Sequence, residues 1–494
     1  MTKGIRLRRR WAFLVVVCLA AAITGGLYLS SRRFKTAEFT PGDPAVDALR
    51  QSLEDANIVI LVLDATRADH LGCYGCPRET TPNIDQLAKS SVLMERHFSQ
   101  SAETKSSTAC LLTAQYCDTN LADGPRAFIP GTFTMEAGLE AAGFSTLLIS
   151  SNLKACPLYG IGDDFQYSVW DRQLEALAEQ GEERYDPRVA LRAFGNWLED
   201  HPDERFFAYL HLLPPHYPYG QPEEFTELFK GLEPVNFEPG GVPFPERIPK
   251  PVPEPPALPE WINLYDANLR YADWAVGEVE KLLRDAGKLD NTLFIITSDH
   301  GESFGEHGHV WHGRSPYDEA CHIPLVVRFP GEQLAGRRIG ALTESVDVLP
   351  TLFDLVMAGY PSAAIQGQSL VPLLAGSAES VSDYAYCRAG GGPSKYLVRS
   401  KDHALVLYAN GEWRALYDLE NDPGQRQNIF AAHGDLAEPM IAAFEQFARE
   451  QRRPPMDFLD PNAVMPPLPE VPEIALSPED RARVNRIADL GYLR

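Results

Sequence analysis

The feature that most constrains the fold of this chain is a short apolar run, NIVILVL at 57–63, that ends at Asp64. A run without polar alternation is typical of a strand buried on both faces of a parallel sheet. Three similar runs follow, each ending near polar residues: 146–150 before Asn152, 206–213 before His216, and 292–297 before Asp299 and His300. Helical stretches separate the runs, which predicts an α/β fold with a large, mostly parallel central sheet flanked by helices.

The polar residues that follow these runs are expected to meet at one edge of the sheet. In sheets of this kind, ligands bind at the carboxyl ends of the strands. One acidic residue after a strand is commonplace, but four strand ends with aspartate, histidine or asparagine indicate a functional site. A flanking helix is expected from about Trp261 to Ala286, ended by Gly287.

The length and composition of the chain indicate how it is divided into domains. Its 494 residues are 44% hydrophobic, which suffices for one large and one small domain. We assign residues 50–384 to the large domain and 385–450 to a small C-terminal α+β subdomain, in which YLVRSKDHALVLY at 396–408 predicts a strand pair. Ten of the 40 prolines lie within 234–259, which predicts an irregular surface excursion, and 451–494 is a proline-rich tail.

The N-terminal residues 1–35 carry a membrane signal. An apolar run from Trp11 to Leu29 has basic residues on both sides, with the larger cluster before it. Its length approaches the roughly 20 residues of a spanning helix, and the charge asymmetry keeps the N-terminus in the cytoplasm. We expect a single-pass anchor with a periplasmic or extracellular catalytic domain. A cleaved signal peptide is the alternative, and it exports the same domain.

Charge and cysteine content exclude two classes of site. The net charge of -23 argues against a nucleic-acid partner. Cys73 and Cys76 form a CxxC pair, but no second pair follows at zinc-finger spacing, so a structural zinc site is not expected. An oxidising compartment would allow one or two disulfides, whose pairing the sequence does not specify.

Two segments carry residues suited to catalysis. SAETKSSTACLLTA at 101–114 is largely helix-like, and Thr104 lies at or just before the helix N-terminus, where the dipole favours an anion. A hydroxyl there is either a helix cap or a nucleophile. Asp64, Asp299 and His300 would supply ligands for zinc or manganese. With an ionised Thr104 they would form a four-coordinate site in which the metal lowers the pKa of the hydroxyl.

Several longer segments follow one another in a recognisable order: VLDATRADHLGCYG at 62–75, TTPNIDQLA at 80–88, TSDHGESFGEHG at 297–308, YDEACHIPLVVRFPG at 317–331, ESVDVLPTLFDL at 344–355, GQSLVPLLAG at 367–376 and LYDLENDPGQRQNI at 416–429. Together they resemble the sulfatase family of the alkaline phosphatase superfamily. The resemblance covers nearly the whole chain from residue 57. It implies a large α/β domain, a small C-terminal sheet domain and metal-dependent ester cleavage.

The resemblance also implies roles for individual residues. It places three of them at metal-ligand positions: Asp64, Asp299 and His300. Thr104 falls at the nucleophile position when LLTA at 111–114 is aligned with the family's LLTG. His216 and His312 match positions that contact the transferred group or assist the leaving oxygen.

Three departures from the family pattern concern the nucleophile and its surroundings. Classical sulfatases oxidise a cysteine or serine of a CxPSR-type motif to formylglycine, whereas this chain has TKSST at 104–108, and threonine cannot form that aldehyde. Ala65 replaces a second aspartate, and SSNL at 150–153 replaces a GKWH signature. The threonine resembles phosphoryl-handling relatives, such as phosphoethanolamine transferases and lipoteichoic acid synthases, which use one transition metal. Zinc or manganese therefore fits better than calcium.

Three functions are consistent with these residues. The first is a hydrolase of sulfate, phosphate or phosphonate esters, in which Thr104 forms a covalent ester while His312 and His216 stabilise developing charge. The second is a phosphoethanolamine-type transferase that modifies an envelope glycan or lipid. The third is a catalytically silent envelope scaffold. His307 and His309 are candidate ligands of a second metal.

Overall fold

The computed structural model describes residues 43–452, apart from 123–125, 130, 221, 236–257, 391–393 and 410–412. The membrane signal in 1–35, most of the excursion at 234–259 and nearly all of the tail at 451–494 therefore lie outside the described residues. Among the residues that are described, no helix combines the length and apolar character needed to cross a bilayer.

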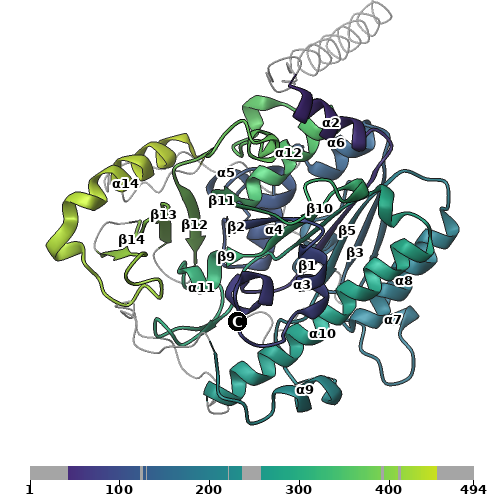
Figure 1. Cartoon of the computed structure of the whole chain (residues 1–494), viewed down its shortest axis with the longest axis horizontal. Helices are drawn as coiled ribbons and strands as arrows, with labels where there is room; N and C mark the ends of the chain where they lie inside the picture. Colours follow the sequence, from purple (N-terminus) through teal and green to yellow (C-terminus); the bar gives the residue numbers. More distant parts are fainter. Residues whose placement is uncertain are drawn as a thin grey trace, which may run out of the picture.

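A mixed, mostly parallel sheet forms the centre of the large domain (Figure 1). Its strands are β1 (Asn57–Leu63), β2 (Val92–Phe98), β3 (Ser145–Ser150), β4 (Tyr167–Trp170), β5 (Phe206–Leu212), β6 (Thr292–Thr297), β9 (His322–Ile323), β10 (Leu325–Arg328) and β11 (Arg337–Glu344). The order is β11-β2-β10-β6-β1-β5-β3-β4, with β9 paired to β2. Strands β6, β1, β5, β3 and β4 pair in parallel, and β10 pairs antiparallel to both of its neighbours. The predicted fold class is confirmed, and the four apolar runs are four of these strands.

Helices cover both faces of this sheet. The described helices of the large domain are α2 (Pro44–Ser52), α3 (Pro82–Ala88), α4 (Thr104–Thr113), α5 (Cys117–Asn120), α6 (Met135–Ala141), α7 (Arg172–Leu177), α8 (Pro187–Asp200), α9 (Glu223–Phe229), α10 (Leu258–Asp285), α11 (Asp318–Cys321), α12 (Val348–Leu355) and α13 (Val371–Ala375). Successive side chains of β1 point to opposite faces. Val59 and Leu61 pack in one core with residues of α3, α8 and α10, and Ile58 and Ile60 pack in another with residues of α4, α6 and α12.

Helix α10 begins at Leu258, before the predicted start at Trp261, and so includes Pro259. Proline is tolerated in the first turn of a helix because its missing N–H would have no intrahelical acceptor there. The excursion predicted for 234–259 therefore ends earlier than the proline pattern suggested. At the other end, Gly287 has a φ of 67°, the left-handed conformation that commonly terminates a helix and that glycine adopts readily.

The C-terminal subdomain is a second, antiparallel sheet covered by one helix. Its strands pair in chain order: β12 (Ala385–Ala389), β13 (Lys395–Arg399), β14 (His403–Tyr408) and β15 (Arg414–Asp418), with α14 at Phe430–Glu450. Val398 and Leu405 of the sheet share a buried cluster with Phe444 of α14. The small α+β subdomain is confirmed, and β13 and β14 are the predicted strand pair. A short hairpin of β7 (Ser303–Phe304) and β8 (Val310–Trp311) follows β6 in the large domain.

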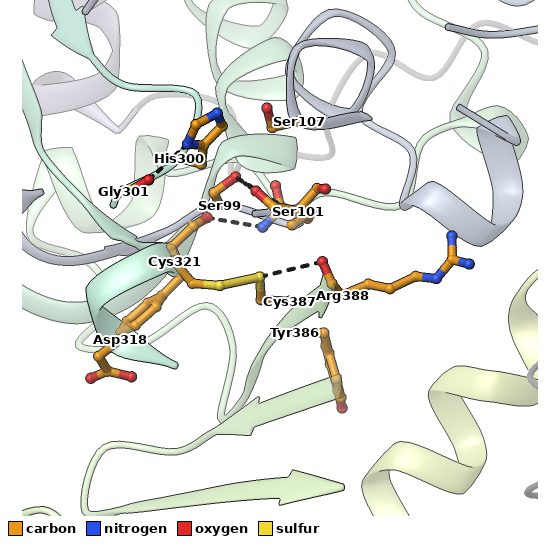
Figure 2. The surroundings of a disulfide bond; sticks show 12 residues. Ser99, Ser101, Ser107, His300, Gly301, Asp318, Cys321, Tyr386, Cys387 and Arg388 are labelled. Atoms are coloured by element: carbon orange, nitrogen blue, oxygen red, sulfur yellow. Dashed lines mark hydrogen bonds between the residues drawn. A yellow bond between two sulfur atoms is a disulfide. The ribbon is translucent and has the colours of Figure 1, made fainter. Parts of the chain in front are cut away.

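A disulfide between Cys321 of α11 and Cys387 of β12 joins the two domains (Figure 2). Backbone hydrogen bonds run beside it: the Ser99 N–H donates to the Cys321 carbonyl at 2.9 Å, and Arg388 pairs with the backbone of residues 100–102. The bridge therefore secures the segment that leads directly into α4.

Replacing both bridge cysteines, Cys321→Ser with Cys387→Ser, is expected to lower the free energy of unfolding by about 2–4 kcal/mol, because the bridge restricts an unfolded chain across a separation of 66 residues. Thermal unfolding without reductant measures the change. Cys73→Ser removes a free thiol and serves as the control. Equal stability of the double variant and the wild type would contradict the prediction.

Candidate active site

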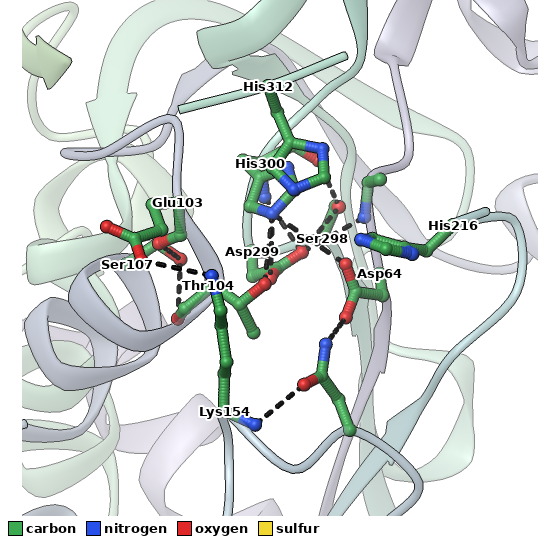
Figure 3. Close-up of polar contacts among 12 residues, drawn as sticks. Asp64, Glu103, Thr104, Ser107, Lys154, His216, Ser298, Asp299, His300 and His312 are labelled. Carbon is green, nitrogen blue, oxygen red and sulfur yellow. Dashed lines mark hydrogen bonds and ion pairs between the residues drawn. The ribbon is translucent and has the colours of Figure 1, made fainter. Parts of the chain in front are cut away.

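Four neighbouring strands bring the sequence-predicted polar residues to one edge of the sheet. The order β6-β1-β5-β3 places Asp299 and Asp64 beyond adjacent strand ends, with His216 and Asn152 beyond the next two. All four side chains are buried. Figure 3 shows Asp64, Asp299 and His216 converging on the same region.

Thr104 reaches this edge from the helix that follows β2. It is the first residue of α4, and its Oγ1 lies 3.2 Å from His300 Nε2. Glu103, not Thr104, occupies the cap position. The hydroxyl therefore lies at the positive end of the helix dipole, where N–H groups lack intrahelical acceptors. This is the location expected of a nucleophile that must carry negative charge.

Asp64 and Asp299 each keep one carboxylate oxygen without a hydrogen bond from any described residue. Asp64 Oδ2 accepts from Asn152 Nδ2 and from His211 Nε2, the latter at 3.1 Å, whereas Oδ1 has no donor. Asp299 Oδ1 accepts from two backbone N–H groups at 2.9 and 3.1 Å, whereas Oδ2 has no donor. Burying a charged oxygen without a partner is costly, so the two free oxygens fit a bound cation.

His300 presents a third free donor atom. Its Nδ1 donates to the Gly301 carbonyl at 2.8 Å, which leaves Nε2 for a ligand. Nε2 lies 3.7 Å from Asp64 Oδ1, 3.4 Å from Asp299 Oδ2 and 3.2 Å from Thr104 Oγ1. Ligand atoms at about 2.0–2.2 Å from a tetrahedral ion are separated by roughly 3.3–3.6 Å. The distances from His300 Nε2 to the three other predicted ligands are thus close to the separation between two ligands of one divalent cation.

His211 of β5 belongs to the same cluster, and the sequence analysis missed it. Ligand atoms of Asp64, His211 and Asp299 all lie within 4.8 Å of one another, a buried group that could hold a metal ion. The His211 Nδ1 lies 3.2 Å from the Tyr209 hydroxyl. Its Nε2, however, contacts the Asp64 oxygen that Asn152 also bonds, and not the free one. The same Nε2 lies 3.9 Å from the free Asp299 Oδ2, so His211 is itself a candidate metal ligand. We expect it instead to position Asp64, as partners outside the ligand set commonly do.

The charges of the cluster stabilise one another. Burial raises the pKa of Asp64, but the imidazoles of His216 and His211 outweigh burial and hold that pKa below its usual range. Burial lowers the pKa of His300, and the carboxylates of Asp299 and Asp64 raise it above its usual value. Asp64 is therefore ionised at neutral pH, which is the state in which a carboxylate binds a metal.

His216 and His312 lie beside the candidate metal ligands, where they were predicted. Their ring centroids are 4.9 Å apart, and the His312 centroid is 4.2 Å from that of His300. Glu302, which was not predicted, has Oε1 at 2.9 Å from His312 Nδ1 and accepts from the Tyr219 hydroxyl at 2.8 Å. Burial, reinforced by His300, lowers the pKa of His312 to about 3. The Glu302 contact fixes the ring and leaves Nε2 of His312 for substrate.

Lys154 brings a positive charge to the mouth of the site, and it too was missed. Its Nζ lies 3.2 Å from Glu103 Oε1, and the two side chains are 23% and 39% exposed. Figure 3 shows Lys154 alongside Thr104. The Lys154 N–H donates to Asn152 Oδ1 at 2.7 Å, so the loop after β3 orders both side chains. A lysine in this place suits an anionic substrate.

His307 and His309 do not form the second metal site that the sequence suggested. Both nitrogens of His307 are engaged: Nδ1 with Glu319 Oε1 at 2.8 Å, and Nε2 with the Gln425 carbonyl at 2.9 Å. Within the described part of the chain, no cluster with metal-ligand spacing includes either histidine. His307 instead links the loop after β6 to the C-terminal subdomain.

Comparison with known protein families agrees with this geometry. A model of the sulfatase family matches residues 56–359. A second model, described as the C-terminal part of N-sulphoglucosamine sulphohydrolase, matches residues 305–450. The first match alone covers more than half of the 494-residue chain.

Individual relatives extend over most of the described fold. The chain is 24% identical to the N-acetylglucosamine-6-O-sulfatase of Bacteroides thetaiotaomicron over 474 residues, covering 77% of this chain and 84% of the relative. It is 23% identical to an arylsulfatase of Clostridium perfringens, covering 76% and 90%. The phosphonate monoester hydrolase of Agrobacterium radiobacter shares the fold, with a TM-score of 0.66 at 22% identity over 80% of this chain and 95% of that chain.

Metal affinity should separate the ligand His300 from the positioning residue His211. His211→Gln is expected to weaken Zn²⁺ or Mn²⁺ binding about 10–100-fold, because Asp64 loses a partner while every ligand remains. His300→Ala, which removes a ligand, should weaken it further. Titration of the metal-stripped full chain by calorimetry measures both affinities.

His97→Gln is the matched control, since this buried histidine bonds Thr343 and lies outside the cluster. A greater loss of affinity in His211→Gln than in His300→Ala would make His211 a metal ligand and overturn the assignment.

Proposed function

The chain belongs to the sulfatase family of sulfuric ester hydrolases, and from this premise we propose that Thr104, in place of formylglycine, is its nucleophile. The observation that carries the proposal is the place of Thr104 Oγ1, at the start of α4 and 3.2 Å from His300 Nε2. Threonine has a methyl group on Cβ, so oxidation of its hydroxyl would give a ketone and not the family's aldehyde. The hydroxyl itself must therefore react.

The reaction proceeds by covalent catalysis in two steps. Thr104 Oγ1 gives up its proton and attacks the sulfur, the bond from sulfur to the alcohol oxygen breaks, and that oxygen takes up a proton and leaves as the alcohol. Water then attacks the sulfur of the ester on Thr104, the bond to Oγ1 breaks, sulfate leaves, and Oγ1 regains a proton. A divalent cation, zinc or manganese by its donor set, supplies Lewis-acid chemistry when bound by four residues: Asp64, Thr104, Asp299 and His300. These residues carry the free donor atoms described above.

The side chains around this group handle the substrate's charge. His312 is oriented by Glu302 through Nδ1, so its Nε2 is directed to the leaving oxygen. His216 lies beside it and contacts the transferred group. Lys154, at the mouth, offsets the negative charge of the entering ester.

A sulfated carbohydrate is the substrate class with the most support. The relative from Bacteroides thetaiotaomicron acts on N-acetylglucosamine 6-sulfate by its name, and a structure of similar fold was solved with D-glucosamine-2-N,6-O-disulfate. A phosphonate ester is the second candidate, because the phosphonate monoester hydrolase shares the fold. The complete set of donor atoms favours an enzyme over a silent scaffold, and the hydrolase relatives favour water over an envelope glycan or lipid as acceptor.

We also propose that the catalytic domain acts outside the cytoplasm. The basic-flanked apolar run within residues 1–35 supports this location. So does the disulfide between Cys321 and Cys387, because such bridges persist in oxidising compartments. Protease added to intact spheroplasts should digest the domain, and complete protection would contradict the location.

Thr104→Ala is expected to abolish turnover while the protein still folds and binds metal, since the nucleophilic oxygen is lost but three ligands remain. Thr104→Ser should retain measurable activity, because it keeps the hydroxyl. Rates on an aryl sulfate, a sugar 6-sulfate and an aryl phosphonate monoester, with zinc or manganese present, test this. Mass spectrometry of a quenched reaction should find the transferred group on Thr104.

Thr113→Ala is the matched control, because this threonine lies in the same helix and its hydroxyl bonds only the Ala109 carbonyl. Wild-type rates in Thr104→Ala would exclude Thr104 as the nucleophile. A product that forms only when an envelope glycan or lipid is added would indicate the transferase instead.

A further inference from the structure

Aromatic side chains flank the two histidines that lie beside the candidate metal ligands. Tyr217 directly follows His216, and Trp311 directly precedes His312. The ring centroids of Tyr217 and Trp311 lie 6.3 Å apart, and the ring centroids of His216 and His312 lie 4.9 Å apart. Two chain segments far apart in the sequence thus each contribute one histidine and one aromatic ring to the same place.

The two aromatic residues form the outer layer of a larger cluster. Trp311 packs edge-on against Trp261 of α10 at 5.9 Å, and Tyr217 packs edge-on against Tyr219 at 5.7 Å. Trp261 is buried, whereas Tyr217 is 40% exposed and Trp311 partly exposed. The inner rings therefore support the outer pair, which keeps accessible surface. We call Tyr217 and Trp311 the aromatic wall.

Tyr219, which packs against Tyr217 of the aromatic wall, connects the wall to the candidate active site. The Tyr219 hydroxyl donates to Glu302 Oε2 at 2.8 Å, and Glu302 Oε1 lies 2.9 Å from His312 Nδ1. The tyrosine that supports Tyr217 therefore also fixes the carboxylate that orients His312. A substrate whose ester oxygen lies next to His312 would extend its leaving group along this wall.

The backbone at Trp311 has an uncommon conformation for a bulky residue. Its φ is 66°, in the left-handed region that bulky side chains avoid. Strain of this kind persists where the surrounding structure enforces it, commonly at ligand-binding sites. The buried indole N–H of Trp311 also has no acceptor among the described residues.

We propose that the aromatic wall of Tyr217 and Trp311 is the subsite for the leaving group, and that it selects esters whose alcohol carries a ring. The shared chemistry is a ring with an apolar face, either the C–H face of a pyranose or the face of an aryl group, stacked on the aromatic side chains. This inference rests on the proposed ester hydrolysis and adds its substrate selectivity. Binding energy from this part of the substrate, remote from the reacting atom, holds the ester oxygen beside His312.

The test compares esters that differ in the alcohol alone. Tyr217→Leu and Trp311→Leu are assayed on N-acetylglucosamine 6-sulfate, 4-nitrophenyl sulfate and ethyl sulfate, which has no ring. The variants should raise KM for the ring esters by about 10-fold, with kcat nearly unchanged, and leave kcat/KM for ethyl sulfate unaltered. The ring ester with the larger loss identifies a sugar or an aryl leaving group. An equal loss on ethyl sulfate, or no loss on either ring ester, would overturn the proposal.

Two further measurements separate this inference from the proposed function. Tyr167→Leu is the matched control. This tyrosine is 37% exposed, but it belongs to the edge strand β4, where it packs against Trp197 of α8. Calorimetric binding of N-acetylglucosamine 6-sulfate and of 4-nitrophenyl sulfate to Thr104→Ala, with and without Tyr217→Leu, requires no turnover. Weaker binding of either ring ester in the Tyr217→Leu variant supports the wall even if no ester is hydrolysed, whereas unchanged binding of both overturns it even if hydrolysis is confirmed.

Discussion

Two carboxylates, Asp64 and Asp299, lie buried beyond adjacent strand ends, and the rest of the site follows from the need to compensate their charge. The pairing of β1 with β6 brings them together, and the closed cores on both faces of the sheet exclude water from them. Each satisfies one oxygen with N–H donors and leaves the other free. Such an arrangement is stable only beside positive charge. This requirement explains why imidazoles, and not apolar side chains, surround the two aspartates.

The predicted residues that the structure brings together at the candidate site are those whose position follows from local signals. Asp64, Asp299 and His300 come directly after buried apolar runs, so the strand itself carries them to the carboxyl edge. Thr104 was harder, because a hydroxyl at a helix N-terminus is usually a cap, and only the family resemblance predicted it as the nucleophile. The expected α/β class likewise follows from alternating runs and helices, which are local patterns.

The residues that were missed depend on contacts between distant segments. His211 lies inside β5, where the signal was one histidine in the otherwise apolar FFAYLHL at 206–212, yet its role follows from the register that pairs it with Val62, two residues before Asp64. Glu302 was visible beside the ligands, but its contact with His312 depends on the β7–β8 hairpin. The bridge from Cys321 depends on how two domains pack, which no spacing of cysteines specifies. The periodicity of a sequence predicts which face of a helix or strand is buried, but it does not predict which other helices or strands pack against that face.

Ala65 lies where the family has a second aspartate, and this difference bears on both the proposed metal and the proposed nucleophile. Ala65 has no carboxylate to offer, and its N–H donates to Asp299 Oδ1 at 3.1 Å, so the family's second aspartate has no counterpart at this position. The proposed ligands are three oxygens and one imidazole nitrogen, a set typical of zinc or manganese, whereas calcium takes about six to eight oxygen ligands. Losing one carboxylate also removes one negative charge beside the cation. In the proposed mechanism an ionised Thr104 would restore that charge, so the same substitution that disfavours calcium would suit an alkoxide nucleophile.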